Sequence, residues 1–342
     1  MALLQTILVY TIACIAGFYT SVRLAIRYVS NPSAFPVKKR DKPPKCLTDP
    51  DLGVHGYLSL KGIKIHYVEK GDRSKPLMLF VHGFPEFWYS WRYQMKEFSK
   101  DYWTVAIDMR GYGDSEKPSG VKYYSMDYLV DDIKQVVEAL GRQKIILVAH
   151  DWGGAIAWNF ILKHHEMVQS YIIMDAPYFP AFPEVAKENP KQFFCSLYMC
   201  FFQLPYLPEL FLSSFDFRGF RRLFRGKNPK TPFTVSDEDI EAFKYNFSKP
   251  EGLTPALNYY RANVLRIRPS SPSQMKLDIE PHGLLIFGEL DRYLLPAHVP
   301  AAQKYVKNLE GRIVKGANHF VQQDDPDTVN KYMREFLEKN VK

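Results

Sequence analysis

Cysteine is scarce in this chain of 342 residues, which holds only Cys14, Cys46, Cys195 and Cys200. No two of them form a Cys-x-x-Cys pair, so their spacing predicts neither a disulfide framework nor a zinc site. We therefore expect reduced, buried thiols. Internal repeats and low-complexity tracts are also missing, and charged residues make up 24% of the chain. This composition excludes a collagen-like chain, a disordered chain and a polytopic membrane protein.

Positive charge is not spread along the whole chain, although the net charge is +8. Residues 23–45 hold seven basic side chains and one acid, which leaves a net charge of only +2 for the rest of the chain. Proteins that bind nucleic acids spread Lys and Arg over one face of a folded domain. We therefore expect no nucleic-acid partner.

Residues 2–22 form a long apolar run without any charge. As a helix this run would be about 32 Å long, enough to cross the hydrocarbon core of a membrane. A cleaved signal peptide is the alternative, but the positively charged start is missing and such apolar runs usually have only about 7–15 residues. We therefore predict a transmembrane anchor at 1–22 and a basic, proline-rich tether at 23–52.

The charges next to this run predict its orientation. Lys and Arg collect on the cytoplasmic side of a span, and the basic residues lie after the run rather than before it. We expect a single-pass membrane protein of the endoplasmic reticulum, with its amino terminus in the lumen and its folded domain in the cytosol. The sequon Asn246-Phe247-Ser248 would then stay without a glycan.

Short apolar strands alternate with helical segments from residue 53 onward, which predicts an α/β domain over 53–342 with a mostly parallel, doubly wound sheet. We expect buried strands at 76–83, 103–109, 144–150, 168–176 and 283–289, and helices at 125–140, 152–164 and from 327 onward. Residues 178–224 interrupt this alternation, because they hold 14 aromatic residues and no strand pattern. A mostly helical cap is therefore predicted at about 177–276.

The segment Ala149-His150-Asp151-Trp152-Gly153-Gly154 lies between a predicted strand and a predicted helix. Its small residues permit a sharp turn, which in α/β hydrolases presents the nucleophile, usually Ser in Gly-x-Ser-x-Gly. That motif is missing from the chain, so a serine esterase or lipase is disfavoured. Asp151 is the candidate nucleophile, although the same pattern also fits an Asp that caps a helix.

Two later loops complete a candidate triad. Asp291 follows a predicted strand 140 residues after Asp151, and His319 lies 28 residues further on. Nucleophile, acid and histidine follow one another in this order in α/β-hydrolase triads, and the long first gap leaves room for the cap. Asp291 is the candidate that orients His319, and His319 is the candidate base.

An earlier loop, His82-Gly83-Phe84-Pro85, follows another buried strand. In this fold that loop supplies one oxyanion N–H donor, and the residue after the nucleophile supplies the other. The backbone amides of Phe84 and Trp152 are therefore the candidate donors. His82 and Pro85 belong to the same site, with His82 interpreted as a structural member of its loop.

Four segments, HGFPE, DMRGYGDSEKP, HDWGG and GANHF, resemble those of the epoxide hydrolases of the α/β-hydrolase superfamily. The resemblance runs from about Gly53 to the carboxyl end, and the apolar amino terminus makes the chain most similar to the membrane-anchored branch of epoxide hydrolases 3 and 4. It implies the α/β-hydrolase fold and two cap tyrosines that hydrogen-bond the epoxide oxygen. These are Tyr198, five residues before Gln-x-Pro, and Tyr260, before Arg-x-Asn.

The activity implied by the resemblance is hydrolysis of lipophilic, fatty-acid-type epoxides to vicinal diols. In this chemistry Asp151 forms an alkyl ester, and water activated by His319 hydrolyses it. The implied partners are the epoxide, water and a membrane. Neither a metal nor an organic cofactor is expected, and the oligomeric state is not predicted.

Two other functions stay open at this point. A haloalkane dehalogenase uses the same Asp, acid and His, and Trp152 would suit its halide, but position 84 is Phe where such enzymes often have Asn. A catalytically silent lipid-binding membrane protein is the alternative from another class. Residues 217–225, which mix aromatics with arginines, fit either a solvated cap surface or a contact with anionic lipid headgroups.

Overall fold

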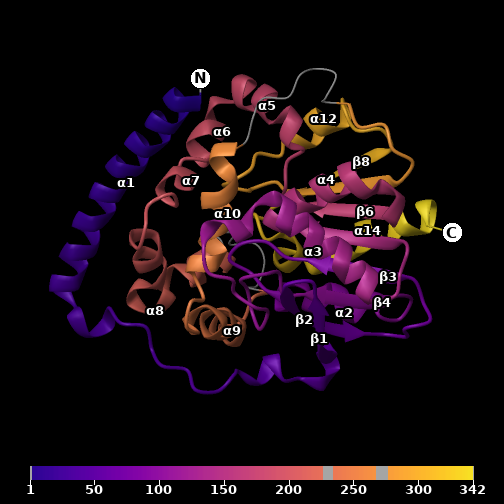
Figure 1. The fold of residues 1–342 in the computed structure, drawn as a ribbon, viewed down its shortest axis with the longest axis horizontal. Helices are drawn as coiled ribbons and strands as arrows, with labels where there is room; N and C mark the ends of the chain where they lie inside the picture. The colour runs from indigo at the N-terminus through magenta and orange to yellow at the C-terminus, as the bar shows by residue number, and fades with distance from the viewer. Residues whose placement is uncertain (1, 226–233, 267–275, 342) are drawn as a thin grey trace.

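The computed structural model describes residues 2–225, 234–266 and 276–341. Among them, eight strands form one sheet (Figure 1): β1 Val54–Leu60, β2 Ile63–Lys70, β3 Leu77–Val81, β4 Trp103–Ile107, β5 Ile145–His150, β6 Val168–Met174, β7 His282–Gly288 and β8 Leu309–Val314. Their order in the sheet is β1-β2-β4-β3-β5-β6-β7-β8. From β4 onward in this order neighbouring strands are parallel, while β2 is antiparallel to β1 and β4. The predicted mostly parallel sheet is confirmed.

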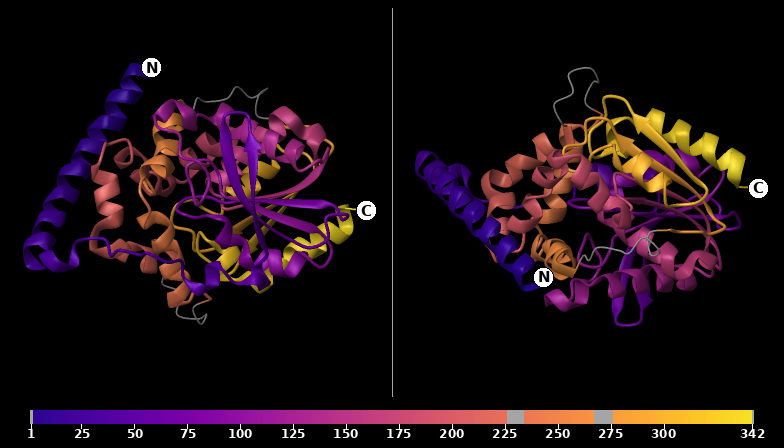
Figure 2. Two further views of the ribbon diagram at one scale, coloured as in Figure 1. Left: turned by 60° about the horizontal axis from the view of Figure 1, so that its bottom comes forward. Right: turned by 90° about the horizontal axis from the view of Figure 1, so that it is seen from above.

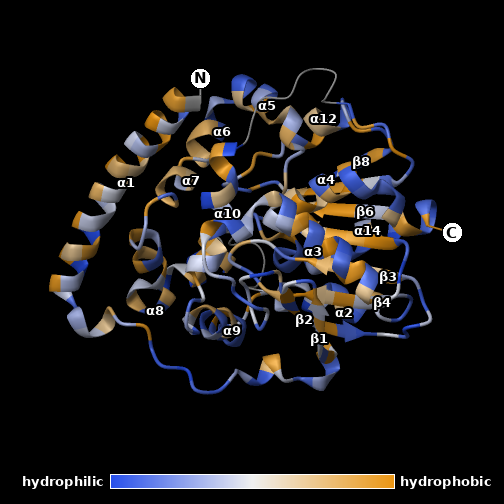
Figure 3. Ribbon diagram, in the orientation of Figure 1, coloured by the Kyte–Doolittle hydropathy of each residue, from blue (hydrophilic) through white to orange (hydrophobic). Residues whose placement is uncertain are grey.

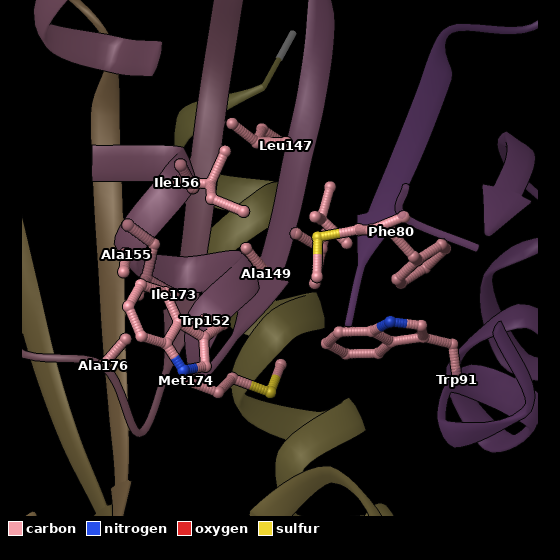
Figure 4. Packing of buried hydrophobic residues seen from close by; sticks show 14 of the residues in the cluster. Phe80, Trp91, Leu147, Ala149, Trp152, Ala155, Ile156, Ile173, Met174 and Ala176 are labelled. Carbon is pink, nitrogen blue, oxygen red and sulfur yellow. The ribbon is translucent and has the colours of Figure 1, made fainter. Parts of the chain in front are cut away.

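Helices cover both faces of the sheet (Figures 1 and 2). They are α2 Arg92–Phe98, α3 Met126–Ala139, α4 Trp152–His164, α12 His298–Gln303, α13 Val321–Asp324 and α14 Pro326–Asn340. Because helices shield both of its faces, a central strand reads as a continuous apolar run, and every residue of β3, β4 and β5 is buried. Figure 4 shows this core, in which Ile156 of α4 lies near Ala149 of β5, and the Phe80 and Trp91 rings lie 5.2 Å apart between centroids.

The predicted helical cap is inserted between β6 and β7. Its helices are α5 Phe182–Glu188, α6 Pro190–Cys195, α7 Tyr198–Phe201, α8 Leu207–Arg225, α9 Asp237–Ser248 and α10 Thr254–Asn263. Helix α8 has a kink in its middle, where Phe215, Asp216 and Phe217 take a left-handed backbone conformation. The predicted end of the cap near 276 adjoins residues that lie outside the described part of the chain.

The apolar amino-terminal run forms one helix, α1 (Ala2–Ser30), which continues beyond the predicted end of the anchor at Val22. Charge marks where a span can end, but Arg23 and Arg27 do not break a helix, and α1 stops only before Asn31-Pro32. By length and composition, Leu3–Ser30 could cross a membrane, and Figure 3 shows the hydropathy of its residues. Most of this helix is exposed.

Helix α1 does not stand apart from the protein. It packs along α7 and α8 on the side of the cap away from the sheet (Figures 1 and 2). Gly17 permits this close approach, because a Cβ added there would lie only 2.7 Å from Cδ1 of Leu204. The apolar helix and the cap therefore share an interface.

Residues 31–52, the part of the predicted tether 23–52 that follows α1, contain three short 3-10 helices and are also fixed to the cap. The Arg40 guanidinium donates to the Asp216 carboxylate at 2.7 and 2.8 Å and to Glu241 at 3.0 Å, and the Cys46 N–H donates to Glu238 at 3.1 Å. The four cysteines are free, but their predicted burial is wrong: Cys14 is exposed, and the others are only partly buried. Cys14 is exposed because it lies on the outer face of α1.

Candidate active site

Asp151 lies in the sharp turn between β5 and α4. Its φ of 49° falls in the left-handed region, which costs a residue other than glycine about 1–3 kcal/mol and which surrounding contacts must hold in place. Gly153 allows the turn to pack, because a Cβ there would collide with the Val81 carbonyl oxygen. The Asp151 Oδ1 accepts the Phe84 N–H at 2.8 Å, and its Oδ2 lies 3.3 Å from Nε2 of His319.

His319 stands on the loop after β8, between two carboxylates. Its Nδ1 lies 2.7 Å from Oδ2 of Asp291, and Oδ1 of Asp291 accepts the N–H groups of Tyr293 and Leu294 at 2.7 and 3.0 Å. Burial alone would lower the pKa of His319, but the negative charges of Asp291 and Asp151 raise it well above its ordinary value. The structure thus brings the three predicted triad residues together, with a protonated imidazole in the resting protein.

A third buried carboxyl, Asp175 at the end of β6, was not singled out by sequence. Its Oδ1 accepts the Gly288 N–H at 2.9 Å. Burial and the negative charge of Asp291 raise the pKa of Asp175 well above its ordinary value, so it is protonated. Ligand atoms of Asp175, Asp291 and His319 lie within 4.8 Å of one another, close enough to hold a metal ion. However, a neutral carboxyl and an imidazolium are poor ligands.

The loop after β3 contributes the backbone donor described above. Phe84 and Pro85 line the cavity over Asp151, and the peptide bond between them is cis. His82 is wholly buried beneath them: its Nδ1 lies 2.8 Å from the Gly83 carbonyl oxygen, and its Nε2 accepts the Met109 N–H at 3.1 Å. His82 therefore supports the loop rather than lining the cavity.

A buried hydrogen bond between Glu86 and His150 connects this loop to the loop of His319. Glu86 accepts the Gly83 N–H at 2.9 Å and lies 2.6 Å from Nδ1 of His150, whose Nε2 lies 2.7 Å from the His319 carbonyl oxygen. Burial opposes ionisation of Glu86, but its interactions with the His150 ring and the Gly83 N–H lower the pKa of Glu86 to about 2. The sequence did not single out Glu86, although this residue ends the HGFPE segment.

The two predicted cap tyrosines face Asp151 from α7 and α10. The ring centroids of Tyr198 and Tyr260 lie 5.9 Å apart. Burial raises the pKa of both well above the ordinary value, and the negative charge of Asp151 adds to this effect, so both remain proton donors. The adjacent Tyr259 points elsewhere, because its O–H donates to the Arg110 carbonyl oxygen at 2.7 Å.

Trp152 and Tyr293 complete the aromatic surroundings. The buried Trp152 side chain packs against Tyr260, with 5.0 Å between ring centroids. Of the two predicted oxyanion donors, the Phe84 amide donates to the Asp151 carboxylate. Within the described ranges, the Trp152 amide makes no hydrogen bond to this carboxylate. Tyr293, which the sequence did not indicate, lies between Tyr198 and His319, with ring centroids at 5.4 and 5.1 Å. Its place two residues after Asp291 is the signal that would have suggested it.

These groups face one cavity of about 690 Å³, within the range of about 300–1,000 Å³ that is common for small-molecule sites. Its wall is mostly apolar, with contributions from Phe84, Phe201, Phe202, Phe211, Leu212, Phe215, Phe220, Leu223 and Phe320. A nucleophilic carboxylate, a histidine base and two phenolic donors thus meet in an apolar chamber. Such a chamber suits an uncharged electrophile whose leaving atom needs a proton.

Comparison with known proteins gives one consistent picture. Residues 76–326, which contain the triad and both cap tyrosines, match the family model of the alpha/beta hydrolase fold. The chain is 42% identical to epoxide hydrolase 3 of Xenopus tropicalis, over 98% of this chain and 92% of that protein. It is 40% identical to epoxide hydrolase 4 of Homo sapiens, over 89% and 84%. A crystal structure of a Bacillus megaterium epoxide hydrolase with an inhibitor matches with a TM-score of 0.74 at 34% identity, covering 83% of this chain and 100% of that chain.

Proposed function

This chain belongs to the epoxide hydrolases of the α/β-hydrolase fold family, and we propose that it opens lipophilic epoxides with Asp151 as the nucleophile. The observation that carries this assignment is the placement of the Asp151 carboxylate, which lies between the Phe84 amide and His319 and opposite Tyr198 and Tyr260. A carboxylate suits the reaction, because its attack on carbon leaves an ester that the same site can hydrolyse.

In the first step, Asp151 attacks one ring carbon from the side opposite the C–O bond, and that bond breaks. Tyr198 and Tyr260 donate hydrogen bonds to the departing oxygen, and one of them transfers its proton to it. Their raised pKa values keep both tyrosines protonated until the alkoxide forms. The products are a hydroxyalkyl ester on Asp151 and a tyrosinate.

The ester changes the charge balance around His319. One of the two carboxylates that raise its pKa is now neutral, so the imidazolium more readily gives its proton back to the tyrosinate. The neutral imidazole, still held by Asp291, then takes a proton from the water that attacks the ester carbonyl. Amides of Phe84 and Trp152 stabilise the oxyanion, each donor contributing about 3 kcal/mol in comparable sites. The intermediate then expels the alkoxide, which takes the second proton of the attacking water to give the diol, and Asp151 is regenerated as a carboxylate beside a protonated His319.

Trapping the intermediate tests this mechanism. The His319→Gln protein, incubated with a long-chain epoxide, should accumulate an adduct on Asp151, because the ester forms but is not hydrolysed. Intact-protein and peptide mass spectrometry would locate it. The Asp151→Ala protein, as the control, should form neither adduct nor diol. Diol production by that control at the normal rate would exclude Asp151 as the nucleophile.

Two features support a lipophilic epoxide as the substrate. The apolar wall gains about 25 cal/mol for each Å² of apolar surface that it buries, so longer chains should lower KM. The Tyr198 and Tyr260 hydroxyls suit an oxygen leaving group, whereas a halide would not need a proton. Diol formation from a series of epoxides measures the effect of chain length. Halide release from a chloroalkane of the same length measures the preference for an oxygen leaving group. Equal kcat/KM for short polar and long apolar epoxides would contradict this assignment.

For location, we propose a single-pass protein of the endoplasmic reticulum with its catalytic domain in the cytosol, because the basic residues follow the apolar run. The natural sequon is a poor reporter, since Asn246 is buried in α9. Asp72→Asn creates a sequon, Asn-Arg-Ser, in an exposed turn after β2. When this variant is isolated from cells, treatment with an endoglycosidase should not change its mass. A mass increase that the additional change Ser74→Ala removes would place the domain in the lumen.

A further inference from the structure

The cavity that contains Asp151 extends through the cap to α1. Its wall there includes Tyr19, Thr20, Arg23, Leu24 and Arg27. These residues lie in the last turns of α1, where the uncharged run gives way to arginines, and α1 covers the side of the cap away from the sheet (Figures 1 and 2). One chamber therefore connects the catalytic groups beyond the carboxyl ends of the parallel strands with the charged end of the apolar helix.

The charged residues of this chamber differ between its two ends. Apart from Asp151 and His319, each charged residue of its described wall is an arginine. We call these four residues the arginine rim: Arg23 and Arg27 from α1, and Arg218 and Arg222 from α8. All four are exposed, and a guanidinium stays charged at any physiological pH. The chamber thus has a cationic mouth and a mostly apolar interior.

The arginine rim has no carboxylate to neutralise it in the ranges that the structure describes. The nearby acids are already held by other cations: Arg40 binds Asp216 at 2.7 Å, and Arg221 binds Asp237. Arg23 instead contacts the Tyr19 side chain, with its guanidinium 5.4 Å from the ring centroid. Arg221 is next to Arg222 in the sequence but does not line the chamber. The chain therefore concentrates four unneutralised cations around this opening.

We propose that the arginine rim binds the carboxylate of a long-chain epoxy acid while its epoxide reaches Asp151, an inference that rests on the proposed function. A guanidinium offers the forked donors that match a carboxylate. A carboxylate close to Asp151 would be repelled by it, and binding at the rim keeps the two negative charges apart. The substrate class is thus the ionised acid, in preference to its neutral ester.

A comparison of paired substrates tests the rim. Full-length protein in neutral micelles is given a long-chain epoxy fatty acid or its methyl ester, and kcat/KM is measured for each. We expect the acid-to-ester ratio to fall about tenfold, equivalent to about 1.4 kcal/mol, in the double variants Arg23→Gln/Arg27→Gln and Arg218→Gln/Arg222→Gln. Arg221→Gln is the matched control on α8 and should keep the wild-type ratio. Added salt should reduce the wild-type ratio, because exposed charges are screened.

The outcomes separate three cases. An unchanged ratio in both double variants would overturn the rim as a carboxylate site, while turnover of the ester would still support the proposed function. If neither substrate is hydrolysed by the wild-type protein, the proposed function itself fails. A lipid phosphate could occupy the rim instead: in vesicles of phosphatidylcholine with added phosphatidylserine, the variants would then lose both activities equally. That result would also overturn the proposal.

Discussion

Asp175 and Asp291 follow neighbouring strands, β6 and β7, and their carboxyls lie close together near His319. One of these carboxyls is neutral and the other is charged. Asp291 receives two backbone N–H bonds and contacts the imidazole, and although burial opposes its ionisation, His319 lowers the pKa of Asp291. Asp175 receives one N–H bond, and burial and Asp291 raise its pKa. Two aspartates of one site thus differ in charge, because Asp175 is neutral and Asp291 is negatively charged.

We predict different consequences for the two Asp→Asn changes. Asp291→Asn removes the charge that stabilises the imidazolium and should lower kcat by about 10⁴, as the same change does in other triads. Asp175→Asn replaces a neutral group by a neutral group of similar shape and should change kcat by less than about threefold. Steady-state diol formation measures both. A loss for Asp175→Asn as large as that for Asp291→Asn would mean that Asp175 carries charge.

The pKa of His319 should fall when Asp151 loses its charge. Asp151→Asn imitates the neutral ester, so an NMR titration of the His319 ring should give a lower pKa in this variant than in the wild type. A raised pKa in the folded protein also contributes stability that is complete below the ordinary histidine pKa of about 6.5 and is lost as pH rises through the folded value.

The stability advantage of wild type over His319→Gln should accordingly shrink as pH rises above neutrality. Thermal unfolding of both proteins across this pH window is the measurement, and their difference cancels the titration of groups that do not interact with His319. An advantage that grows with pH would contradict a protonated His319 in the resting protein.

The first effect of removing a cap tyrosine should be slower ester formation. Tyr198→Phe or Tyr260→Phe should slow it by about 10²-fold, the lower end of the range for general acids. Rapid-quench mass spectrometry of a single turnover follows the Asp151 adduct directly. Tyr259→Phe is the adjacent control: it removes the bond to the Arg110 carbonyl oxygen, which contributes about 1 kcal/mol of stability, but no proton donor of the site. Equal slowing by Tyr259→Phe would indicate a packing effect.

Arg40 should stabilise the fold by attaching residues 31–52 to the cap. Arg40→Ala leaves the largely buried Asp216 with Lys244 as its remaining cation, and we expect a loss of about 2 kcal/mol in the free energy of unfolding. Lys39→Ala removes an exposed pair with Asp41 and should change it by less than about 0.5 kcal/mol. Chemical denaturation in neutral detergent compares the two variants, and equal losses would exclude a specific role for Arg40.

The acid dependence gives a second measure of this attachment. Burial opposes ionisation of Asp216, but Arg40 and neighbouring donors lower its pKa to about 2. Its stabilising contribution is therefore present above the ordinary Asp pKa of about 3.9 and is lost as pH falls through about 2. Wild type should lose its advantage over Arg40→Ala in this acidic window.

The features that could be predicted from sequence each carry a local signal. The sheet follows from continuous apolar runs, and Asp151 is marked by the small residues of its turn. Spacing alone could not distinguish Tyr260 from Tyr259, because only the bond to the Arg110 carbonyl oxygen shows which ring turns away. No local pattern indicates that Arg40 meets Asp216, 176 positions away, or that α1 packs on the cap.

The position of α1 has a consequence for any soluble form of this enzyme. If α1 anchors the chain as proposed, cleavage after Ser30 would release the domain from the membrane, but it would also take Tyr19, Arg23, Leu24 and Arg27 out of the chamber wall. What remains would be a trough open to water on one side, with half of its cationic mouth gone. Release from the membrane and loss of substrate selectivity would then occur together. A chain that lacks α1 should therefore differ from the full-length enzyme in its substrate selectivity.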